Sequence, residues 1–300
     1  MSIRYFGLYG LAIEASLDLP ELSQLSGPCG RDCIRVGLGQ VPSDLANGTE
    51  MASWIVISPQ ACLYRFEGIA SFLVDRGKSV TIQLEPGAEE ADMRAFLYGV
   101  ALGTLAHQRR MIPIHISAIS TPGGVWAFTG ASGAGKSTLV TSLSRQTGWP
   151  VLCDDVAVLD PADQQPLLHV GMHRVKLWQD SIDLLGVGES EARQDSFREG
   201  KFHVSLPQIF THEPLPLQHM IQIAWGDPVA LTDLQHSLRF EAMMNAIYRP
   251  YLVSMFGHLP GVIAHLGTVA NQVSCHALTR PKSTSAQAEV LEILSTRLLR

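Results

Sequence analysis

The residues best suited to chemistry form a glycine-rich run at 130–138, which reads GASGAGKST. This run matches the pattern G-x-x-x-x-G-K-[ST] in full. Glycines let successive backbone N–H groups approach a phosphate closely, and a helix that follows them presents its positive N-terminus. The lysine neutralises phosphate oxygens, and the next hydroxyl is a ligand for Mg²⁺. The run therefore predicts a P-loop that binds ATP. We expect its nucleotide-binding residues to be Gly130, Ser132, Gly133, Ala134, Gly135, Lys136, Ser137 and Thr138.

A second acidic element follows soon after this run. The apolar segment 151–155 reads VLCDD and ends in two carboxylates, Asp154 and Asp155. A strand with this ending delivers carboxylates to the mouth of a phosphate-binding loop, where one can hold Mg²⁺ and the other can take a proton. Asp154 comes 18 positions after Lys136, whereas P-loop ATPases and GTPases usually place this strand farther away.

The elements that position these residues alternate between strand and helix patterns, which is typical of an α/β nucleotide-binding core. Before this core, residues 1–88 contain short β-like runs separated by Gly, Pro, Asn and Asp, which predicts a small β-rich N-terminal module. We therefore expect two domains, 1–88 and 89–300. In the second domain we expect strands near 113–119, 125–129, 150–159 and 273–278, helices near 89–110, 136–146, 234–247, 261–271 and 285–299, and a mobile loop over 186–203.

Composition excludes several classes of function. The 300 residues carry a net charge of −6, which offers no basic footprint for nucleic acid. The longest apolar stretch, 95–106, is well short of the roughly 20 residues that a membrane-spanning helix needs. The N-terminal segment has Glu14 and Asp18 where a signal peptide requires an apolar run. We therefore expect a cytoplasmic protein with neither a nucleic-acid nor a membrane partner.

Three segments together resemble a known family. The strand IPIHISAI with His115, the loop GASGAGKST and the run LCDD resemble the HPr serine kinase/phosphorylase family over about residues 112–160. The wider chain, including YFGLYGLAIEASLDLPEL, RVKLWQDS, REGKFHV and NAIYRP, resembles the HPr-kinase-like proteins of lasso-peptide biosynthesis. The resemblance implies a P-loop HPr-kinase-like core. It also implies ATP- and Mg²⁺-dependent phosphorylation of the C-terminal serine of a lasso precursor peptide.

The resemblance also implies roles for individual residues. Lys136 would hold the ATP phosphates, and Ser137 and Asp155 would ligate Mg²⁺. Asp154 would be the general base for the serine hydroxyl, although the two aspartates can trade these roles. His115 would polarise the phosphate or modulate the base.

Further cations are candidates for the charge that develops in phosphoryl transfer or for a peptide carboxylate. We expect Lys201, at the end of the predicted loop, to assist catalysis. We expect Lys176, Arg198 and Arg249 to bind substrate.

The chain departs from the family downstream of Asp155. The signature Glu-x-Arg-Gly-x-Gly is not recognisable there, and residues 171–178 read GMHRVKLW instead, which weighs against phosphorylase activity and an HPr protein substrate. Three alternatives stay open: an HPr-type protein serine kinase, a P-loop ATPase, and a nucleotide-sensing module. No LSGGQ or N-K-x-D motif supports a hydrolase. The oligomeric state is open, a homo-oligomer included.

Overall fold

The computed structural model of the chain describes residues 3–27, 33–172, 174–188, 192–195, 198–205, 213–283 and 286–298. The fold is mixed α/β, as the sequence predicts. The chain forms two compact units. The first comprises Met1–Pro113, Val158–Pro161 and Tyr248–Val262, and the second comprises Ile114–Ala157, Ala162–Ile247 and Ile263–Arg300.

The first unit contains a nine-stranded mixed sheet in the order β3-β1-β2-β4-β9-β8-β7-β6-β5. Buried and half-buried side chains alternate along strands such as β8, so one face of the sheet packs into the core. The described part of 1–88 forms strands and no helix, which agrees with its predicted β-rich character. The strands are β1 (Arg4–Leu8), β2 (Leu11–Ala15), β3 (Ser23–Gln24), β4 (Ile34–Leu38), β5 (Thr49–Ala52), β6 (Ile55–Ile57), β7 (Ala61–Phe66), β8 (Ala70–Asp75) and β9 (Ser79–Leu84).

The helical segment after this sheet belongs to the first unit. It consists of α1 (Glu90–Phe96), a π-helical stretch η2 (Leu97–Ala101) and α2 (Leu102–Gln108). The predicted domain boundary at residue 88 assigns the segment to the second domain instead. Its apolar side chains pack on the N-terminal sheet, and the Tyr64 and Thr104 hydroxyls share a buried hydrogen bond of 2.7 Å. The short helix α6 (Tyr251–Met255) also belongs to this unit.

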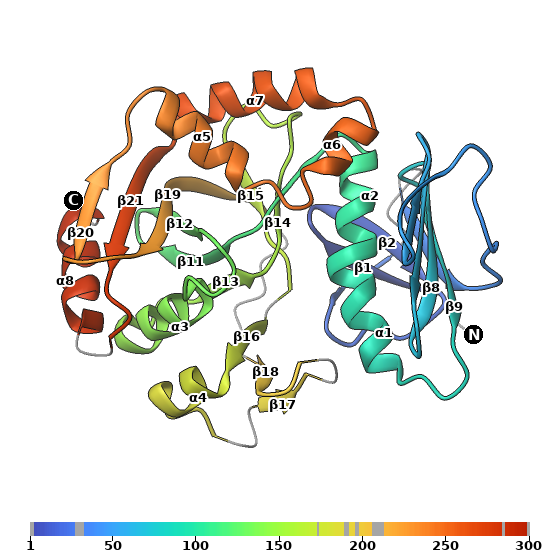
Figure 1. Cartoon of the computed structure of the whole chain (residues 1–300), viewed down its shortest axis with the longest axis horizontal. Helices are drawn as coiled ribbons and strands as arrows, with labels where there is room; N and C mark the ends of the chain where they lie inside the picture. The colour runs from blue at the N-terminus through green and yellow to red at the C-terminus, as the bar shows by residue number, and fades with distance from the viewer. Residues whose placement is uncertain are drawn as a thin grey trace. The chain divides into compact units, whose positions relative to one another are not determined.

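The second unit is built on a mixed sheet with β12 (Gly124–Thr129) inside it (Figure 1). On one side β12 pairs with β11 (Ser117–Thr121), which pairs in turn with β13 (Val151–Asp154), both antiparallel. On the other side β12 runs parallel to β19 (Leu215–Trp225), and β19 runs parallel to β21 (Ser274–Arg280). Beside these lie β15 (Leu167–His169), antiparallel to β19, and β20 (Ala230–Asp233), antiparallel to β21. Two further strands, β14 (Ala157–Leu159) and β10 (Ile112–Ile114), extend the sheet beyond β15.

Helices cover both faces of this sheet. The α3 (Lys136–Thr147) and α8 (Ala286–Leu298) helices contribute Leu139, Leu143 and Leu294 to a core that also holds Trp126 and Phe128 of β12. Trp126 and Phe128 share a face because side chains two apart in a strand point the same way. Helix α5 (Ser237–Asn245) packs against β19 and β21 on the opposite side from α3 (Figure 1).

A separate three-stranded sheet carries several of the candidate cations. Its order is β16 (Arg174–Trp178), β18 (Lys201–Ser205) and β17 (Ala192–Gln194), and α4 (Gln179–Leu185) follows β16. The prediction of a loop over 186–203 is therefore wrong for 192–194 and 201–203, because β18 pairs with both neighbouring strands.

Three elements span a boundary between the units: β10 (Ile112–Ile114), β14 (Ala157–Leu159) and α7 (Leu259–Gln272). No helix in the described part of the chain is both long enough and apolar enough to cross a bilayer.

Candidate active site

The connection between β12 and α3, residues 130–135, is named the glycine loop here. Gly130, Gly133 and Gly135 have φ angles of 145°, 81° and 83°, which side-chain-bearing residues rarely adopt. A Cβ atom at Gly130 would lie 2.5 Å from the Ile223 carbonyl oxygen, and one at Gly135 would lie 2.2 Å from Nη2 of Arg280. At Gly130 both conformation and space require glycine, because the Ile223 oxygen belongs to the backbone. At Gly135 the positive φ favours glycine, and a Cβ would also require the Arg280 guanidinium to move.

Lys136, the first residue of α3, folds back onto the glycine loop. Its ammonium donates hydrogen bonds of 2.9 Å to the Gly130 carbonyl and 3.2 Å to the Ala131 carbonyl. Burial lowers the pKa of Lys136, and the nearby Asp154 and Asp155 carboxylates offset part of this effect. The loop lysine and both aspartates therefore lie within electrostatic range of one another, as the sequence predicts.

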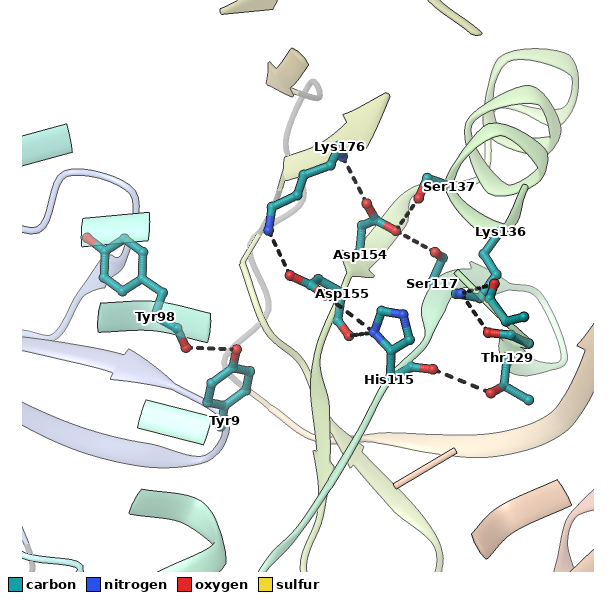
Figure 2. A network of polar contacts seen from close by, with 12 residues as sticks. Tyr9, Tyr98, His115, Ser117, Thr129, Lys136, Ser137, Asp154, Asp155 and Lys176 are labelled. Atoms are coloured by element: carbon teal, nitrogen blue, oxygen red, sulfur yellow. Dashed lines mark hydrogen bonds and ion pairs between the residues drawn. The ribbon is translucent and has the colours of Figure 1, made fainter. Parts of the chain in front are cut away.

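Asp154 is a buried hydrogen-bond acceptor at the end of β13 (Figure 2). Its Oδ1 accepts from the Ser137 hydroxyl at 2.8 Å and also from the Ser117 hydroxyl. Its Oδ2 accepts from the Lys176 backbone N–H at 2.8 Å. Ser117 is opposite Asp154 in the pairing of β11 with β13, so the sheet register brings these two side chains together. Three donors on three elements thus orient the carboxylate toward the start of α3.

Asp155 follows directly but is held by different groups. Its φ of 92° turns the chain out of the strand, and its side chain is 30% exposed. The Lys176 ammonium lies 2.7 Å from Oδ2, and Nδ1 of His115 lies 3.3 Å from Oδ1. Burial raises the pKa of the Asp155 carboxyl, but the Lys176 ammonium and the His115 ring more than offset it, so the pKa lies well below its usual range. Asp155 is therefore ionised at neutral pH.

His115 lies between β10 and β11 with its ring against Asp155 (Figure 2). Nδ1 lies 2.7 Å from the backbone carbonyl oxygen of Asp155. A carbonyl oxygen only accepts, so Nδ1 carries the hydrogen in this bond. The backbone N–H of His115 donates to the Ala246 carbonyl at 2.6 Å. The predicted neighbourhood of His115 and the aspartates is present.

The structure places Lys176 and Lys201 near the two carboxylates. The Lys201 ammonium lies 5.4 Å from the centroid of the Trp178 ring. Burial, Arg198 and Lys176 lower the pKa of Lys201, while Asp155 and Asp154 act in the opposite direction. These mutual effects show that the cations and the carboxylates form one electrostatic cluster.

Arg249 lies in the first unit, and its described contacts are with that unit. Its Nη1 donates to the Tyr251 hydroxyl at 3.0 Å. Its guanidinium lies 5.2 Å from the Tyr248 ring centroid and 5.7 Å from that of Trp54. These contacts account for Arg249 as a cation within an aromatic cluster, and its predicted role in substrate binding stays a prediction.

The remaining residues of the predicted nucleotide site differ in surroundings. Ser132 is exposed in the glycine loop, and Ala134 is buried. The Thr138 hydroxyl shares a hydrogen bond of 2.7 Å with the Ser181 hydroxyl, which ties α3 to α4.

Three further residues contact this site and are not among the residues expected from the sequence: Ser117, Trp225 and Arg280. Ser117 follows His115 by two positions in the same extended segment, and this spacing could have indicated it. Trp225 and Arg280 reach the glycine loop from 90 or more positions away in the chain, and no local spacing indicates them.

No protein-family model matches the chain, and a comparison with curated proteins finds no match. The resemblance over residues 112–160 therefore stays a prediction.

Proposed function

We propose that the second unit is a P-loop kinase of the HPr-kinase-like type, which transfers the γ-phosphoryl group of ATP to a serine hydroxyl of a peptide. The observation that carries this proposal is the 2.8 Å hydrogen bond from Ser137 to Asp154. It joins the first turn of the helix after the glycine loop to the end of an acidic strand. In phosphoryl-transfer sites of this kind, that hydroxyl and a strand carboxylate hold the metal of the metal–nucleotide complex.

The residues present fit Mg²⁺. Ser137 and Asp154 supply a hydroxyl and a carboxylate oxygen, which are hard ligands that Mg²⁺ prefers. The described residues contain no group of three or more His, Cys, Asp or Glu for a protein-only metal site. Mg²⁺ in kinases uses one or two protein carboxylates together with phosphate oxygens, so a larger group is not needed. When bound, Mg²⁺ would neutralise charge on the phosphates.

The geometry favours Asp155 as the general base and Asp154 on the metal side, which exchanges the roles implied by the resemblance. Asp154 is buried, and its oxygens accept from Ser137, Ser117 and a backbone N–H. Asp155 is partly exposed and ionised, beside His115 and Lys176. In the proposed step the serine oxygen forms a bond to the γ-phosphorus, the bond from that phosphorus to the ADP oxygen breaks, and the serine proton passes to the Asp155 carboxylate.

The cations around Asp155 suit a peptide that ends in a carboxylate. Lys176 and Lys201, with Arg198 in electrostatic range, place positive charge beside the proposed base. A serine at a C-terminus carries its own carboxylate next to the acceptor hydroxyl, so the same cations can orient the acceptor. These cations, together with the resemblance to the HPr-kinase-like proteins of lasso-peptide biosynthesis, support the C-terminal serine of a lasso precursor peptide as the proposed substrate.

Mass spectrometry of a peptide ending in serine, incubated with the protein, Mg²⁺ and ATP, tests the function. A matched peptide ending in alanine and the Lys136→Ala variant are the controls. The proposal predicts one added phosphate on the terminal serine and none with either control. ATP consumption without a phosphopeptide would instead indicate a hydrolase, and ATP binding without turnover would indicate a nucleotide-sensing module.

A further inference from the structure

Two residues at the ends of neighbouring strands contact the glycine loop. Trp225 ends β19 and Arg280 ends β21. Nε1 of Trp225 donates to the Gly133 carbonyl at 3.1 Å. Nη2 of Arg280 donates to the carbonyls of Ala134 and Gly135 at 3.1 and 3.2 Å. Both side chains therefore lie directly against the loop that we propose to bind phosphates.

Trp225 and Arg280 also contact each other. The guanidinium carbon lies 4.4 Å from the centroid of the indole, within the range of a cation–π interaction. The guanidinium lies over the indole, yet 41% of Trp225 remains exposed. An exposed tryptophan supported by a planar cation leaves a rigid aromatic surface next to the loop.

Arg280 is an unusual cation in this position. It is only 5% exposed, no carboxylate of the described residues offsets the effect of its burial, and its Nε is buried without a hydrogen-bond partner among them. Burial lowers the pKa of Arg280 to about 10, so the guanidinium stays charged at neutral pH. Removing a charge from water is costly, and the indole and two loop carbonyls compensate only in part. A ligand with electron-rich atoms would compensate further.

The sheet order relates these two residues to the proposed phosphate site. β12 leads into the glycine loop and lies between the β11–β13 pair and the β19–β21 pair. The carboxylates at the proposed γ-phosphate end come from β13 and the turn after it, on one side of β12. A nucleotide with its γ-phosphate near Asp155 and its phosphates on the glycine loop would extend toward the other side, where Trp225 and Arg280 end their strands.

We infer that Trp225 and Arg280 form the base-binding platform of the nucleotide site, with the indole stacking on the purine ring of ATP and Arg280 holding the indole in place. This inference rests on the proposed function. It adds that the stacked purine ring, and not the phosphates alone, determines how tightly the nucleotide binds. Stacking of a base on an aromatic side chain accounts for about tenfold or more in affinity.

Isothermal titration of the full-length chain with Mg²⁺·ATP and with Mg²⁺·tripolyphosphate separates the base from the phosphates. We expect Trp225→Ala to weaken ATP binding about tenfold or more beyond any loss of tripolyphosphate binding that follows from the missing hydrogen bond to Gly133. Trp225→Phe keeps an aromatic ring and is expected to retain most of the ATP affinity. Leu238→Ala, which removes another exposed apolar side chain of the second unit, is the matched control and is expected to bind both ligands as the unchanged chain does.

The outcomes distinguish the two proposals. If the unchanged chain binds neither ligand, the proposed function fails. If it binds ATP no more tightly than tripolyphosphate, or if Trp225→Ala weakens both ligands equally, the platform is contradicted while the phosphate site stands. If Trp225→Ala weakens ATP alone but Trp225→Phe weakens it equally, the stacking role of the ring is contradicted.

Discussion

The ammonium of Lys176 lies 2.7 Å from Oδ2 of Asp155. The same residue uses its backbone N–H to hold Asp154, so one position of β16 contacts both carboxylates through different groups. A change of the Lys176 side chain therefore removes a charge from Asp155 and leaves the bond to Asp154 available. This separation makes Lys176 a means of altering one aspartate at a time.

Lys176→Gln is expected to shift the acidic limb of the pH–rate profile to higher pH. Lys176 lowers the pKa of Asp155, so removal of the ammonium raises that pKa, and the active, ionised carboxylate is lost at a higher pH than before. The pH dependence of kcat/KM for peptide phosphorylation measures this. Lys176→Arg keeps the positive charge, so its acidic limb should lie at nearly the same pH as that of the unchanged chain. An unchanged limb in Lys176→Gln would show that Asp155 is not the group that titrates.

Substitution of each of the two aspartates should impair the kinase activity in a different way. Asp155→Asn is expected to keep nucleotide binding and to lower kcat by about 10²- to 10⁴-fold, the range for removal of a general base. Asp154→Asn is expected to raise the Mg²⁺ concentration needed for half-maximal rate, because Asp154 would share the metal with Ser137. Steady-state rates over a Mg²⁺ titration compare the two variants. A large loss of kcat in Asp154→Asn and a raised Mg²⁺ requirement in Asp155→Asn would instead identify Asp154 as the general base.

Gly135→Ala should destabilise the second unit and abolish nucleotide binding. Its φ of 83° strains any other residue, and the new Cβ would displace the Arg280 guanidinium from its hydrogen bonds to Ala134 and Gly135. Strain of this kind costs about 1–3 kcal/mol. Gly133→Ala is the matched control, because its φ is 81° and no atom lies within 4 Å of the added Cβ. Chemical denaturation should rank Gly135→Ala as the less stable, and equal losses would mean that the contact with Arg280 is unimportant.

A buried pair of histidines predicts a loss of stability in acid. Nδ1 of His219 lies 2.9 Å from Nε2 of His276, whose Nδ1 lies 2.9 Å from Asp233. Burial and the neighbouring His276 lower the pKa of His219 to about 4. Between about pH 6.5 and pH 4 the His219 imidazole is therefore protonated in the unfolded chain and neutral in the folded chain. The free energy of unfolding therefore decreases as the pH falls through this range.

Urea unfolding at about pH 7 and about pH 5 measures this effect. His219→Gln should show a smaller decrease in unfolding free energy between the two conditions than the unchanged chain. An identical decrease in both proteins would place the acid sensitivity in other groups.

The local parts of the site could be predicted from the sequence. The glycine loop, the helix from Lys136 and the strand that ends at Asp154 depend on glycine conformation and on short-range hydrophobic patterns, and the structure has all three. The sequence left the roles of the two aspartates open. Only the donors around them, on β11, α3 and β16, distinguish the two carboxylates.

The parts that could not be predicted depend on pairing between distant segments. Trp225 and Arg280 reach the glycine loop because β19 and β21 run parallel in one sheet, and this pairing has no signature in local spacing. Lys201 lies in a strand because β18 pairs with β16 and β17, although its surroundings in sequence are glycine-rich and charged. The helical segment 90–108 packs with the first unit because of contacts such as Tyr64 with Thr104.

The most direct test of the central claim follows the γ-phosphoryl group itself. ATP with heavy oxygen in its γ-phosphoryl group is incubated with the protein, Mg²⁺ and a peptide ending in serine, and mass spectrometry locates the label. The account predicts that the labelled phosphoryl group appears on the terminal serine, and that Lys136→Ala abolishes this transfer. Label found only in inorganic phosphate, with the peptide unchanged, would contradict a kinase.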